Sequence, residues 1–494
     1  MRLSKLFEGI EALDTAGSGD PEIRGLSTDS RNVREGDLFI ALRGHAADGH
    51  DYIENAVNAG AAALAVERPV DTDIPVVVLV NTSTAEALLA RRFYGDPSSR
   101  LVLTGITGTN GKTSTAFLLQ SILDLSHGPA GIIGTVGFGS GGKLQAATHT
   151  TPSSVELNRI LARFAGRGCR SAVMEVSSHA ARQGRIAGME FDVGIFTNIT
   201  RDHLDYHLTL LNYIEAKERF VRTLSGLERR KGEGVLVYNI DDDLVRAVGE
   251  RFEGRKLSFG EGAKADYRCE GLRAGLEGTS FELRAPDFEL DVSMKLPGRF
   301  GAWNAMAAAA AARAAGASPE HIKEGLERVE LIPGRFQVVS KGAGPSVVVD
   351  YAHTPDALEK LLLFCRELEP SRLITVFGCG GDRDRGKRPM MGGISMRLSD
   401  MVYVTSDNPR TEDPDAIIKD VLEGMRGYDT PFEAVTDRGE AIRRAVGSAR
   451  EGELVVLAGK GHEDYQVLAG ETIHFSDSEE AEKALAALAA NGQD

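Results

Sequence analysis

The stretch at residues 105–114 constrains the fold of this chain most, because it joins a strand pattern directly to a helix pattern. Residues 101–104 before it are apolar and β-prone, and residues 116–125 after it repeat apolar side chains at helical spacing. The stretch itself reads GITGTNGKTS. Strand, glycine loop and helix in this order are the setting of a phosphate-binding loop. The sequence therefore predicts an α/β unit that binds a nucleoside triphosphate.

Each residue type in this loop has a chemical reason to be there. Glycines let backbone N–H groups converge on phosphate oxygens, and the helix N-terminus adds partial positive charge. Lys112 can reach the outer phosphates, and the Thr113 hydroxyl can ligate Mg²⁺. The usual first glycine of such a loop is replaced by Ile106, with glycines at 105 and 108 instead. An ordinary strand-to-helix turn is the alternative.

Length and composition indicate a multidomain globular protein. A chain of 494 residues is too long for one core, so about three domains are expected. The net charge of −15 disfavours nucleic acid and anionic membranes as partners. Four scattered cysteines without a CxxC pair fit a reducing compartment. No apolar signal core or transmembrane run is present, so we expect a cytoplasmic protein.

Residues 1–98 are predicted to form a small α/β unit. Short strands are expected at 38–42, 62–66 and 76–80, with helices at 52–59 and 85–94. Thr82 or Ser83 is expected to cap the second helix.

Residues 99–333 are predicted to form a central, mostly parallel sheet domain. Strands at 101–106, 172–177, 193–197 and 235–239 alternate with helical segments, which is typical of a sheet covered on both faces. The alanine-rich helix expected at 303–317 has little bulk and can approach the sheet closely; another helix follows at 320–329.

Residues 334–494 are predicted to form a third, Rossmann-like α/β domain. Continuous apolar runs at 347–349, 373–377, 401–405 and 454–457 are typical of buried parallel strands, and helices are expected at 355–368, 414–425 and 437–449. Ligands of open α/β sheets bind beyond the carboxyl ends of the strands, so the loops after these strands are candidate sites.

Two polar segments of the central domain are candidates for metal chemistry. Glu175 ends a buried strand, where a carboxylate commonly completes a Mg²⁺ shell, although a solvated strand end is the alternative. The loop after the strand at 193–197 holds Asp202, His203, Asp205 and His207 without a zinc spacing, and His207 alone could be structural. Lys217 lies in a helical stretch, and composition alone favours an exposed side chain for it.

Three segments of the third domain carry further candidates. Asp350 and His353 lie where a strand meets a helix that begins at Pro355. Residues 380–388 form a glycine-rich basic loop suited to anions, or a solvated loop. Residues 407–410, DNPR, combine an acid, an amide and an arginine, which suits a zwitterionic head group because arginine binds carboxylates bidentately; a capped turn is the alternative.

These motifs together resemble the Mur ligase family of cytoplasmic peptidoglycan enzymes over essentially the whole chain. The resemblance is carried by TGTNGKTS, MEVSSH, TNITRDHLDYH, DYAHTPDAL, FGCGGDRDRGKRP, DNPRTEDP and GKGHEDYQ, which follow one another in the family's order. It also accounts for the shifted glycine of the phosphate loop. DNPR is similar to the signature of members that add meso-diaminopimelate to UDP-N-acetylmuramoyl-L-alanyl-D-glutamate.

The resemblance implies one ligand for each domain. The first would hold the uridine nucleotide through Thr28, Ser30, His45, Ala46 and Ala47, and the second the muramoyl dipeptide through His149, Thr150, Thr151, Ser177, Gln183 and Arg185. ATP would contact Gly108, Thr109, Asn110, Gly111, Lys112, Thr113, Ser114, Asn304, Arg335 and Asp350. Diaminopimelate would contact Arg383, Asp407, Asn408, Pro409, Arg410, Gly459 and Glu463. The family position of His149 is often Asn.

The resemblance further implies catalysis with two Mg²⁺ ions. Their ligands would be Thr113, Glu175, His203 and a carbamate formed from CO₂ on Lys217. The acidic neighbours Glu215 and Glu218 would oppose carbamylation if they lay close to the amine. ATP would convert the D-glutamate γ-carboxylate into an acyl phosphate that the amine attacks. His353 or a carboxylate would take the amine's proton.

Other functions remain open at this point. A lysine-adding ligase of the same family and a folylpolyglutamate-type relative are close alternatives, although the UDP-substrate loops around Ser30 and His45 argue against the second. An alternative of another class is a P-loop NTPase that couples hydrolysis to partner binding and makes no bond. We expect a monomer whose partners are its small-molecule substrates.

Overall fold

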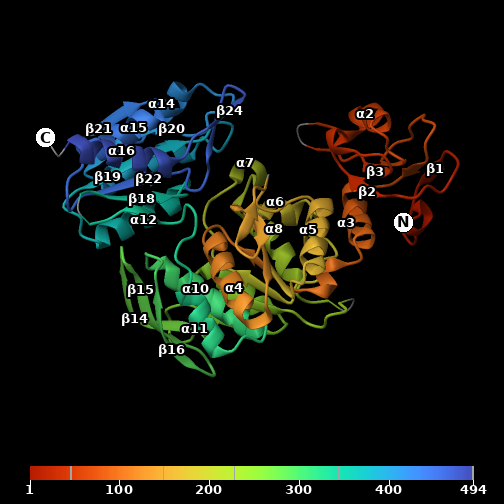
Figure 1. Ribbon diagram of the computed structural model, residues 1–494, viewed down its shortest axis with the longest axis horizontal. Coiled ribbons are helices and arrows are strands. Elements are labelled where there is room, and N and C mark those ends of the chain that lie inside the picture. The colour runs from red at the N-terminus through yellow and green to blue at the C-terminus, as the bar shows by residue number, and fades with distance from the viewer. Residues whose placement is uncertain (45–46, 148, 227–228, 343, 492–494) are drawn as a thin grey trace.

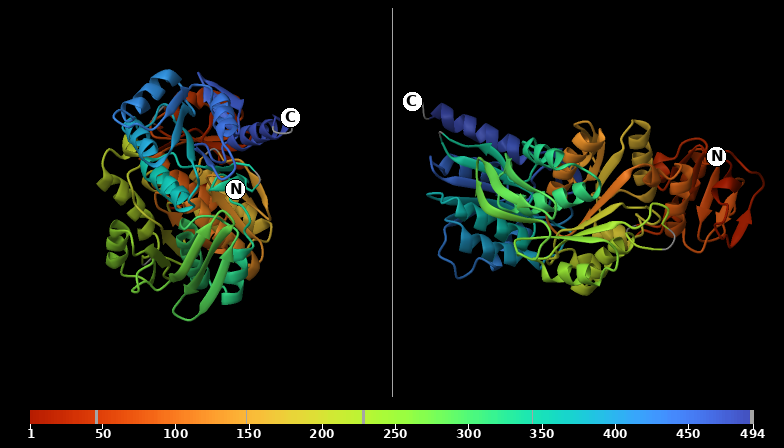
Figure 2. Two further views of the ribbon diagram at one scale, coloured as in Figure 1. Left: turned by 90° about the vertical axis from the view of Figure 1, so that its left-hand side faces the viewer. Right: turned by 90° about the horizontal axis from the view of Figure 1, so that it is seen from below.

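The computed structural model describes residues 1–494 except 45–46, 148, 227–228, 343 and 492–494. Its sheets lie in three lobes, with the N-terminal lobe at one end, the C-terminal lobe at the other and the central lobe between them (Figures 1 and 2). No helix in the described part of the chain is long and apolar enough to cross a membrane.

The N-terminal lobe is built on a five-stranded sheet in the order β1-β5-β4-β3-β2, in which only β1 is antiparallel. Its strands are β1 (Asp14–Ala16), β2 (Gly25–Ser27), β3 (Asp37–Ile40), β4 (Ala63–Val66) and β5 (Val76–Val78). The helices α2 (Ile53–Asn58) and α3 (Thr82–Phe93) match the predicted ones, but the predicted cap of α3 is wrong. Asn81 is the cap, and its side chain accepts from the Thr84 amide at 2.8 Å. The Thr82 hydroxyl instead donates to the Ala41 carbonyl at 2.7 Å.

The central lobe contains an eight-stranded sheet in the order β13-β12-β11-β6-β10-β7-β8-β9. The strands from β13 to β7 are parallel, and β8 and β9 continue as antiparallel strands. Their bounds are β6 (Val102–Thr107), β7 (Ala130–Gly134), β8 (Gly137–Ser140), β9 (Lys143–Gln145), β10 (Ser171–Glu175), β11 (Val193–Phe196), β12 (Val235–Asn239) and β13 (Lys256–Phe259).

Helices bury both faces of this sheet, as predicted. On one face Ile106 packs in a core with α4 (Lys112–His127), the alanine-rich α10 (Phe300–Ala314) and α11 (Pro319–Glu327). On the other face Leu103 packs in a core with α5 (Ser154–Gly166) and α8 (Leu210–Arg222). The alanines of α10 from 307 to 312 are fully buried, so the small side chains serve close packing.

A three-stranded antiparallel sheet that was not predicted packs on the same lobe. It consists of β14 (Arg268–Gly275), β15 (Gly278–Arg284) and β16 (Glu289–Met294). Alternate residues of β15, including Phe281 and Leu283, are buried in the core that contains α10.

The C-terminal lobe contains a six-stranded sheet in the order β17-β18-β22-β19-β20-β21, in which β17 alone is antiparallel. The strands are β17 (Gln337–Ser340), β18 (Ser346–Asp350), β19 (Leu373–Cys379), β20 (Met401–Ser406), β21 (Phe432–Val435) and β22 (Leu454–Ala458). The helices are α12 (Pro355–Glu367), α13 (Lys387–Leu398), α14 (Pro414–Glu423), α15 (Arg438–Ser448) and α16 (Asp477–Asn491). A hairpin of β23 (Tyr465–Leu468) and β24 (Glu471–His474) completes the lobe.

The registers bring the candidate residues to the strand ends. Glu175 at the end of β10 is paired with Ile106 of β6, immediately before the phosphate loop. In the C-terminal sheet Asp350 is paired with Ala458, and Cys379 with Ser406. The segments that follow these strands therefore emerge at the same edge of their sheet.

Candidate active site

The phosphate loop links β6 to α4 and needs its glycines for space as well as for conformation. Gly108 and Gly111 have φ values of +143° and +83°. A Cβ on Gly108 would collide with the Thr197 hydroxyl, and one on Gly111 would lie 2.5 Å from Asn304 Oδ1. Lys112 Nζ folds back and donates to the carbonyls of Gly108 and Thr109 at 2.9 and 2.8 Å. The loop is therefore closely packed, with its lysine beside the loop carbonyls.

Glu175 is buried directly beside the start of α4. Its carboxylate accepts from the Thr113 hydroxyl at 2.9 Å and from the Thr135 amide and hydroxyl at 2.9 and 3.1 Å. Only 1% of Glu175 is exposed. A buried carboxylate and a threonine hydroxyl in contact are hard oxygen donors of the kind that Mg²⁺ prefers.

Lys217 is buried, contrary to the expectation from composition alone. Its Nζ donates to the Gly108 carbonyl at 2.7 Å and lies 4.6 Å from the centre of the Tyr213 ring. Burial, with a further contribution from the nearby Lys112 charge, lowers the pKa of Lys217 well below its ordinary value, against an opposing effect of Asp202. The amine therefore lies at the phosphate loop in surroundings that favour its neutral form.

The acidic neighbours of Lys217 in sequence point away from its amine. Glu215 pairs with Arg219 at 3.4 Å, and Glu218 pairs with Arg222 and Arg251 at 3.5 and 2.5 Å. These ion pairs lie on the outer side of α8, and neither glutamate contributes to the pKa shift of Lys217. Glu215 and Glu218 therefore do not oppose carbamylation of Lys217.

The histidines of the loop after β11 have different surroundings. His203 Nε2 lies 3.3 Å from Asp202, and loss of solvent lowers the pKa of its imidazole. His207 is buried, and its Nε2 lies 3.0 Å from the Ser178 hydroxyl. His203 lines the cavity described below, whereas His207 does not, which supports a structural role for His207.

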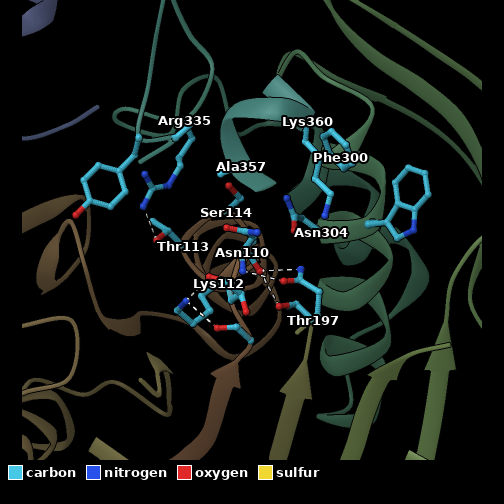
Figure 3. A pocket seen from close by; sticks show the side chains of 18 of the residues that line it. Asn110, Lys112, Thr113, Ser114, Thr197, Phe300, Asn304, Arg335, Ala357 and Lys360 are labelled. Carbon is cyan, nitrogen blue, oxygen red and sulfur yellow. Dashed lines mark hydrogen bonds between the residues drawn. The ribbon is translucent and has the colours of Figure 1, made fainter. Parts of the chain in front are cut away.

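Residues of the C-terminal lobe reach the phosphate loop. Arg335 Nη2 donates to the Thr113 hydroxyl at 3.0 Å, and its guanidinium lies 4.6 Å from the centre of the Tyr351 ring. Asn110 Nδ2 donates to Asp356 at the start of α12 at 2.8 Å. Figure 3 shows Arg335 pointing toward Thr113 beside the loop. Both contacts join the two lobes at the predicted nucleotide site.

Asp350 and His353 lie at the same junction. Asp350 accepts from the Phe336 amide at 2.7 Å, and burial raises the pKa of its carboxyl group. His353 Nδ1 lies 2.8 Å from the Tyr351 carbonyl, which can only accept, so Nδ1 carries the proton and Nε2 is left as an acceptor. Burial lowers the pKa of His353 to about 4, which keeps the ring neutral near pH 7.

A cavity of about 620 Å³ unites these groups between the central and C-terminal lobes. Phe300, Trp303 and Asn304 of α10 line it at one side, as Figure 3 shows for Phe300 and Asn304. The candidate residues that line it are Gly108, Thr109, Asn110, Gly111, Lys112, Thr113, Ser114, Thr150, Glu175, Ser177, His203, Lys217, Asn304, Arg335, Asp350 and His353. The volume is within the range of small-molecule sites.

Five residues predicted to hold the muramoyl dipeptide form a connected cluster beside Glu175. The Thr151 hydroxyl donates to the Glu175 carbonyl at 2.9 Å, and Arg185 donates to the Thr151 carbonyl at 2.6 Å and to Gln183 at 2.9 Å. The remaining members are Thr150, which contacts Thr135, and Ser177, which contacts Thr151. His149 is next to this cluster in the chain.

Thr28, Ser30 and Ala47, which are predicted to bind the uridine nucleotide, lie in the N-terminal lobe and are not among the residues that line the cavity. Thr28 and Ser30 flank Asp29, which caps the short helix that begins at Ser30. Ala47 accepts from the Gly44 amide at 2.9 Å. His45 and Ala46 lie outside the described residues.

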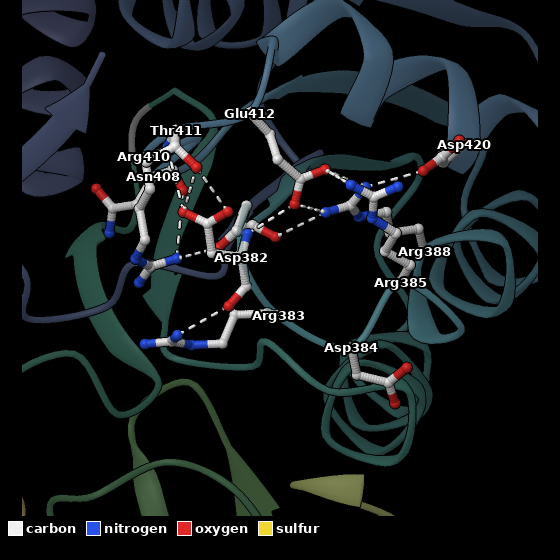
Figure 4. A network of polar contacts seen from close by, with 12 residues as sticks. Asp382, Arg383, Asp384, Arg385, Arg388, Asn408, Arg410, Thr411, Glu412 and Asp420 are labelled. Atoms are coloured by element: carbon white, nitrogen blue, oxygen red, sulfur yellow. Dashed lines mark hydrogen bonds and ion pairs between the residues drawn. The ribbon is translucent and has the colours of Figure 1, made fainter. Parts of the chain in front are cut away.

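The residues predicted to hold an amino acid form a second polar cluster at the edge of the C-terminal sheet. Asn408 is buried, and its Nδ2 donates to Glu463 at 2.8 Å. Arg410 donates to the Gly381 carbonyl at 2.7 Å, and a Cβ on Gly459 would lie 2.9 Å from Asp407. Figure 4 shows Arg383 and Arg410 extending from neighbouring segments.

This second cluster connects to the cavity through Tyr351. The Tyr351 hydroxyl donates to Glu463 at 3.4 Å, and its ring stacks with Arg335, which contacts Thr113. Sequence analysis missed Lys460, whose fully buried Nζ lies 3.2 Å from Glu463. Its position between Gly459 and Gly461 in a loop after a buried strand was the available signal.

Family models match the chain in three consecutive parts. The descriptions are "Mur ligase family, catalytic domain" for residues 22–94, "Mur ligase middle domain" for 106–312 and "Mur ligase, glutamate ligase domain" for 334–461. A relative from Geobacter metallireducens is 43% identical over 510 residues that cover 100% of both chains. The chain belongs to the Mur ligase family.

Two relatives of this Mur ligase share one name. The Geobacter metallireducens protein and one from Bacillus licheniformis, 40% identical over 99% of this chain and 100% of its own, are both named UDP-N-acetylmuramoyl-L-alanyl-D-glutamate--2,6-diaminopimelate ligase. A solved structure of that name is similar with a TM-score of 0.67, 33% identity and 99% coverage of both chains. A Mur ligase of Thermotoga maritima in complex with ADP, at 21% identity and a TM-score of 0.66, shares the fold.

Proposed function

We propose that this Mur ligase joins meso-diaminopimelate to the D-glutamate γ-carboxylate of UDP-N-acetylmuramoyl-L-alanyl-D-glutamate, using ATP, in peptidoglycan precursor synthesis. The shared name of full-length relatives supports the substrates. The observation that carries the chemistry is the contact of Arg335 with Thr113, which brings the C-terminal lobe onto the phosphate loop. Ligation needs this arrangement because acid, nucleotide and amine must meet in one place.

ATP is needed because a carboxylate has oxide as its leaving group and does not react with an amine at neutral pH. The γ-carboxylate attacks the terminal phosphorus of ATP, the bond to ADP breaks, and an acyl phosphate forms. Lys112 and Arg335 stabilise the charge of the transferred group, since both lie at the loop that receives the phosphates. The amine then attacks the acyl carbon, and phosphate leaves.

The residues beside the loop fit Mg²⁺. Thr113 and Glu175 would hold one ion, and Glu175 with a neutral His203 would contribute to holding a second; bound Mg²⁺ supplies charge neutralisation for the phosphates. No group of three or more His, Cys, Asp or Glu side chains suited to a metal occurs among the described residues. Because Mg²⁺ prefers oxygen ligands, the second ion would need a further oxygen donor beside Glu175 and His203.

Carbamylated Lys217 would supply that ligand. The neutral amine attacks CO₂, an N–C bond forms and a proton leaves, which converts a cation into a carboxylate. Burial beside Gly108 favours the neutral amine on which this reaction depends. The position of Lys217 in the cavity lining agrees with a ligand role.

His353 is our candidate for the proton acceptor of the incoming amine. Its Nδ1 is engaged with the Tyr351 carbonyl, which leaves Nε2 with a lone pair on a residue that lines the cavity. The carboxylates of the cavity are the alternative acceptors. A closed cavity also excludes water that would hydrolyse the acyl phosphate.

The two substrates are assigned to the cluster beside Glu175 and the cluster at the edge of the C-terminal sheet. Diaminopimelate occupies the cluster of Arg383, Asp407, Asn408, Pro409, Arg410, Gly459 and Glu463, and the muramoyl dipeptide the cluster at Arg185. The uridine end extends to Thr28 and Ser30. We place the reaction in the cytoplasm and propose that the protein acts as a monomer.

A ligation assay tests this function. The protein is combined with ATP, Mg²⁺ and the UDP-dipeptide, each amino acid is offered in turn, and products are identified by mass spectrometry. We expect product with diaminopimelate and little with lysine, because lysine leaves the Arg410 charge unpaired, at a cost of about 1–3 kcal/mol. Equal use of both would refute the assigned pocket, and ATP hydrolysis without either substrate would favour an NTPase.

A further inference from the structure

The loop at residues 380–387 and the turn at residues 407–412 are in direct backbone contact. The Gly381 amide donates to the Asn408 carbonyl at 2.9 Å, and a Cβ on Gly381 would collide with the Pro409 carbonyl. Arg410 Nη1 donates to the Gly381 carbonyl at 2.7 Å. These segments carry Arg383 and Arg410, so the spacing of two proposed substrate-binding arginines depends on this contact.

Side chains next to the proposed binding residues hold the two segments together from both sides. Glu412 of the turn accepts from the Asp382 amide at 2.7 Å and from both terminal nitrogens of Arg388 at 2.8 and 3.1 Å. Asp382 of the loop in turn accepts from the Thr411 amide at 3.2 Å and hydroxyl at 2.8 Å. Figure 4 shows this reciprocal arrangement, with Asp420 as a second carboxylate on Arg388.

These contacts hold two residues in strained backbone conformations. Asp382 and Arg410 have φ values of +53° and +56°, a region that residues other than glycine rarely adopt. Such conformations persist where surrounding contacts over-determine them, and they cluster at ligand sites. Arg388 is 1% exposed and Glu412 is 13% exposed, so their charge-assisted bonds are shielded from water.

We propose that Asp382, Arg388, Thr411 and Glu412 form a clasp that fixes the separation of Arg383 and Arg410, and so lets the site select an amino acid with a second charged head group. These four are positioning residues, since they act through the two arginines. The proposal rests on the proposed function, because it assigns diaminopimelate to this cluster. A lysine side chain ends in a single ammonium group, so its binding depends less on the spacing of two arginines.

An ion pair that only stabilises the lobe would have different consequences. Its loss would lower the stability of the lobe, and any rise in KM would affect ATP and the UDP-dipeptide as well as diaminopimelate. Loss of a clasp should instead raise KM for diaminopimelate alone, because Arg383 and Arg410 are not among the residues that line the nucleotide cavity.

The first test compares Glu412→Gln with Glu440→Gln in steady-state ligation. Glu440 also accepts from two arginines, Arg443 and Arg444, but on the exposed side of α15, so it is a matched control. We expect Glu412→Gln to raise KM for diaminopimelate about tenfold, as for loss of a charge-assisted bond, with KM for ATP unchanged. The ratio of kcat/KM for diaminopimelate over lysine should also fall.

The second test uses Thr411, where the hydroxyl can be removed or kept. Thr411→Val should raise KM for diaminopimelate, whereas Thr411→Ser should restore it to within about twofold of the wild type, since the bond to Asp382 returns. This pair decides the question even if Glu412→Gln fails to fold.

The outcomes separate the clasp from the proposed function. The clasp alone is overturned if the wild type ligates diaminopimelate and the paired variants do not differ. In that case KM for diaminopimelate would be the same in Glu412→Gln as in Glu440→Gln, and the same in Thr411→Val as in Thr411→Ser. A wild-type protein that does not use diaminopimelate would overturn the proposed function and the clasp with it. A parallel rise in the KM of all three substrates would also overturn the clasp in favour of a purely structural ion pair.

Discussion

Replacing Asp477 by asparagine should destabilise the C-terminal lobe strongly. Arg438 at the start of α15 and Asp477 at the start of α16 are both fully buried and form two bonds of 2.7 Å. Arg438 also donates to the Ala458 carbonyl at 3.0 Å and the Ser406 carbonyl at 3.4 Å, at the ends of β22 and β20. The substitution leaves a guanidinium charge in the interior without its counter-charge.

The magnitude follows from the complete burial of the pair. Removing one partner of a buried ion pair costs about 3–5 kcal/mol, because the remaining charge has lost its water and its partner. For a lobe of roughly 150–250 residues, each kcal/mol lowers Tm by about 2–4 °C. The expected fall in the Tm of the C-terminal lobe is therefore about 6–20 °C.

Calorimetry of the wild type and three variants measures this loss. Glu423→Gln removes an exposed ion pair with Arg426 in the same lobe and should change stability by less than about 1 kcal/mol. The double replacement Arg438→Met with Asp477→Leu should recover most of the loss, since apolar pairs of similar volume replace buried ion pairs at little cost. A fall of less than about 1 kcal/mol for Asp477→Asn would refute the reasoning.

The remaining predictions concern the site. Lys217→Ala should nearly abolish ligation and be partly rescued by short carboxylic acids, whereas full activity in a rate assay would exclude the carbamate. Arg335→Ala should raise KM for ATP without lowering Tm, because its bond to Thr113 joins two lobes; an unchanged KM would contradict that role. The bond from Arg388 lowers the pKa of Glu412 to about 2. The wild type should therefore have a larger free energy of unfolding than Glu412→Gln above about pH 4.5, and this difference should vanish as the pH falls toward 2. A difference that stays constant with pH would contradict the prediction.

The parallel sheets were predictable from the sequence because buried parallel strands are continuous apolar runs. Val347–Val349 and Leu454–Leu457 are of this kind, and both lie in the C-terminal sheet. The sheet of β14, β15 and β16 was missed for the opposite reason. In β15 buried residues alternate with half-buried ones, such as Phe281 with Glu282, and no residue of β14 is fully buried, so neither strand is a continuous apolar run.

The burial of Lys217 had a local signal that composition obscured. Tyr213, Ala216 and Phe220 precede and follow it at helical spacing, and all are buried with it on one face of α8. The cap of α3 was missed because Asn81 and Thr82 are both good caps, and only the fold shows that the Thr82 hydroxyl is engaged elsewhere. The contact between Arg335 and Thr113 spans 222 positions and had no local signal.

The most direct test of the ligase account follows the oxygen of the substrate carboxylate. The UDP-dipeptide is prepared with isotopically heavy oxygen in the γ-carboxylate and ligated with ATP and diaminopimelate, and the released phosphate is analysed by mass spectrometry. Attack of the carboxylate on ATP predicts that one heavy oxygen appears in the phosphate for each amide formed. Phosphate without the heavy oxygen would show that no acyl phosphate forms, and would contradict the account.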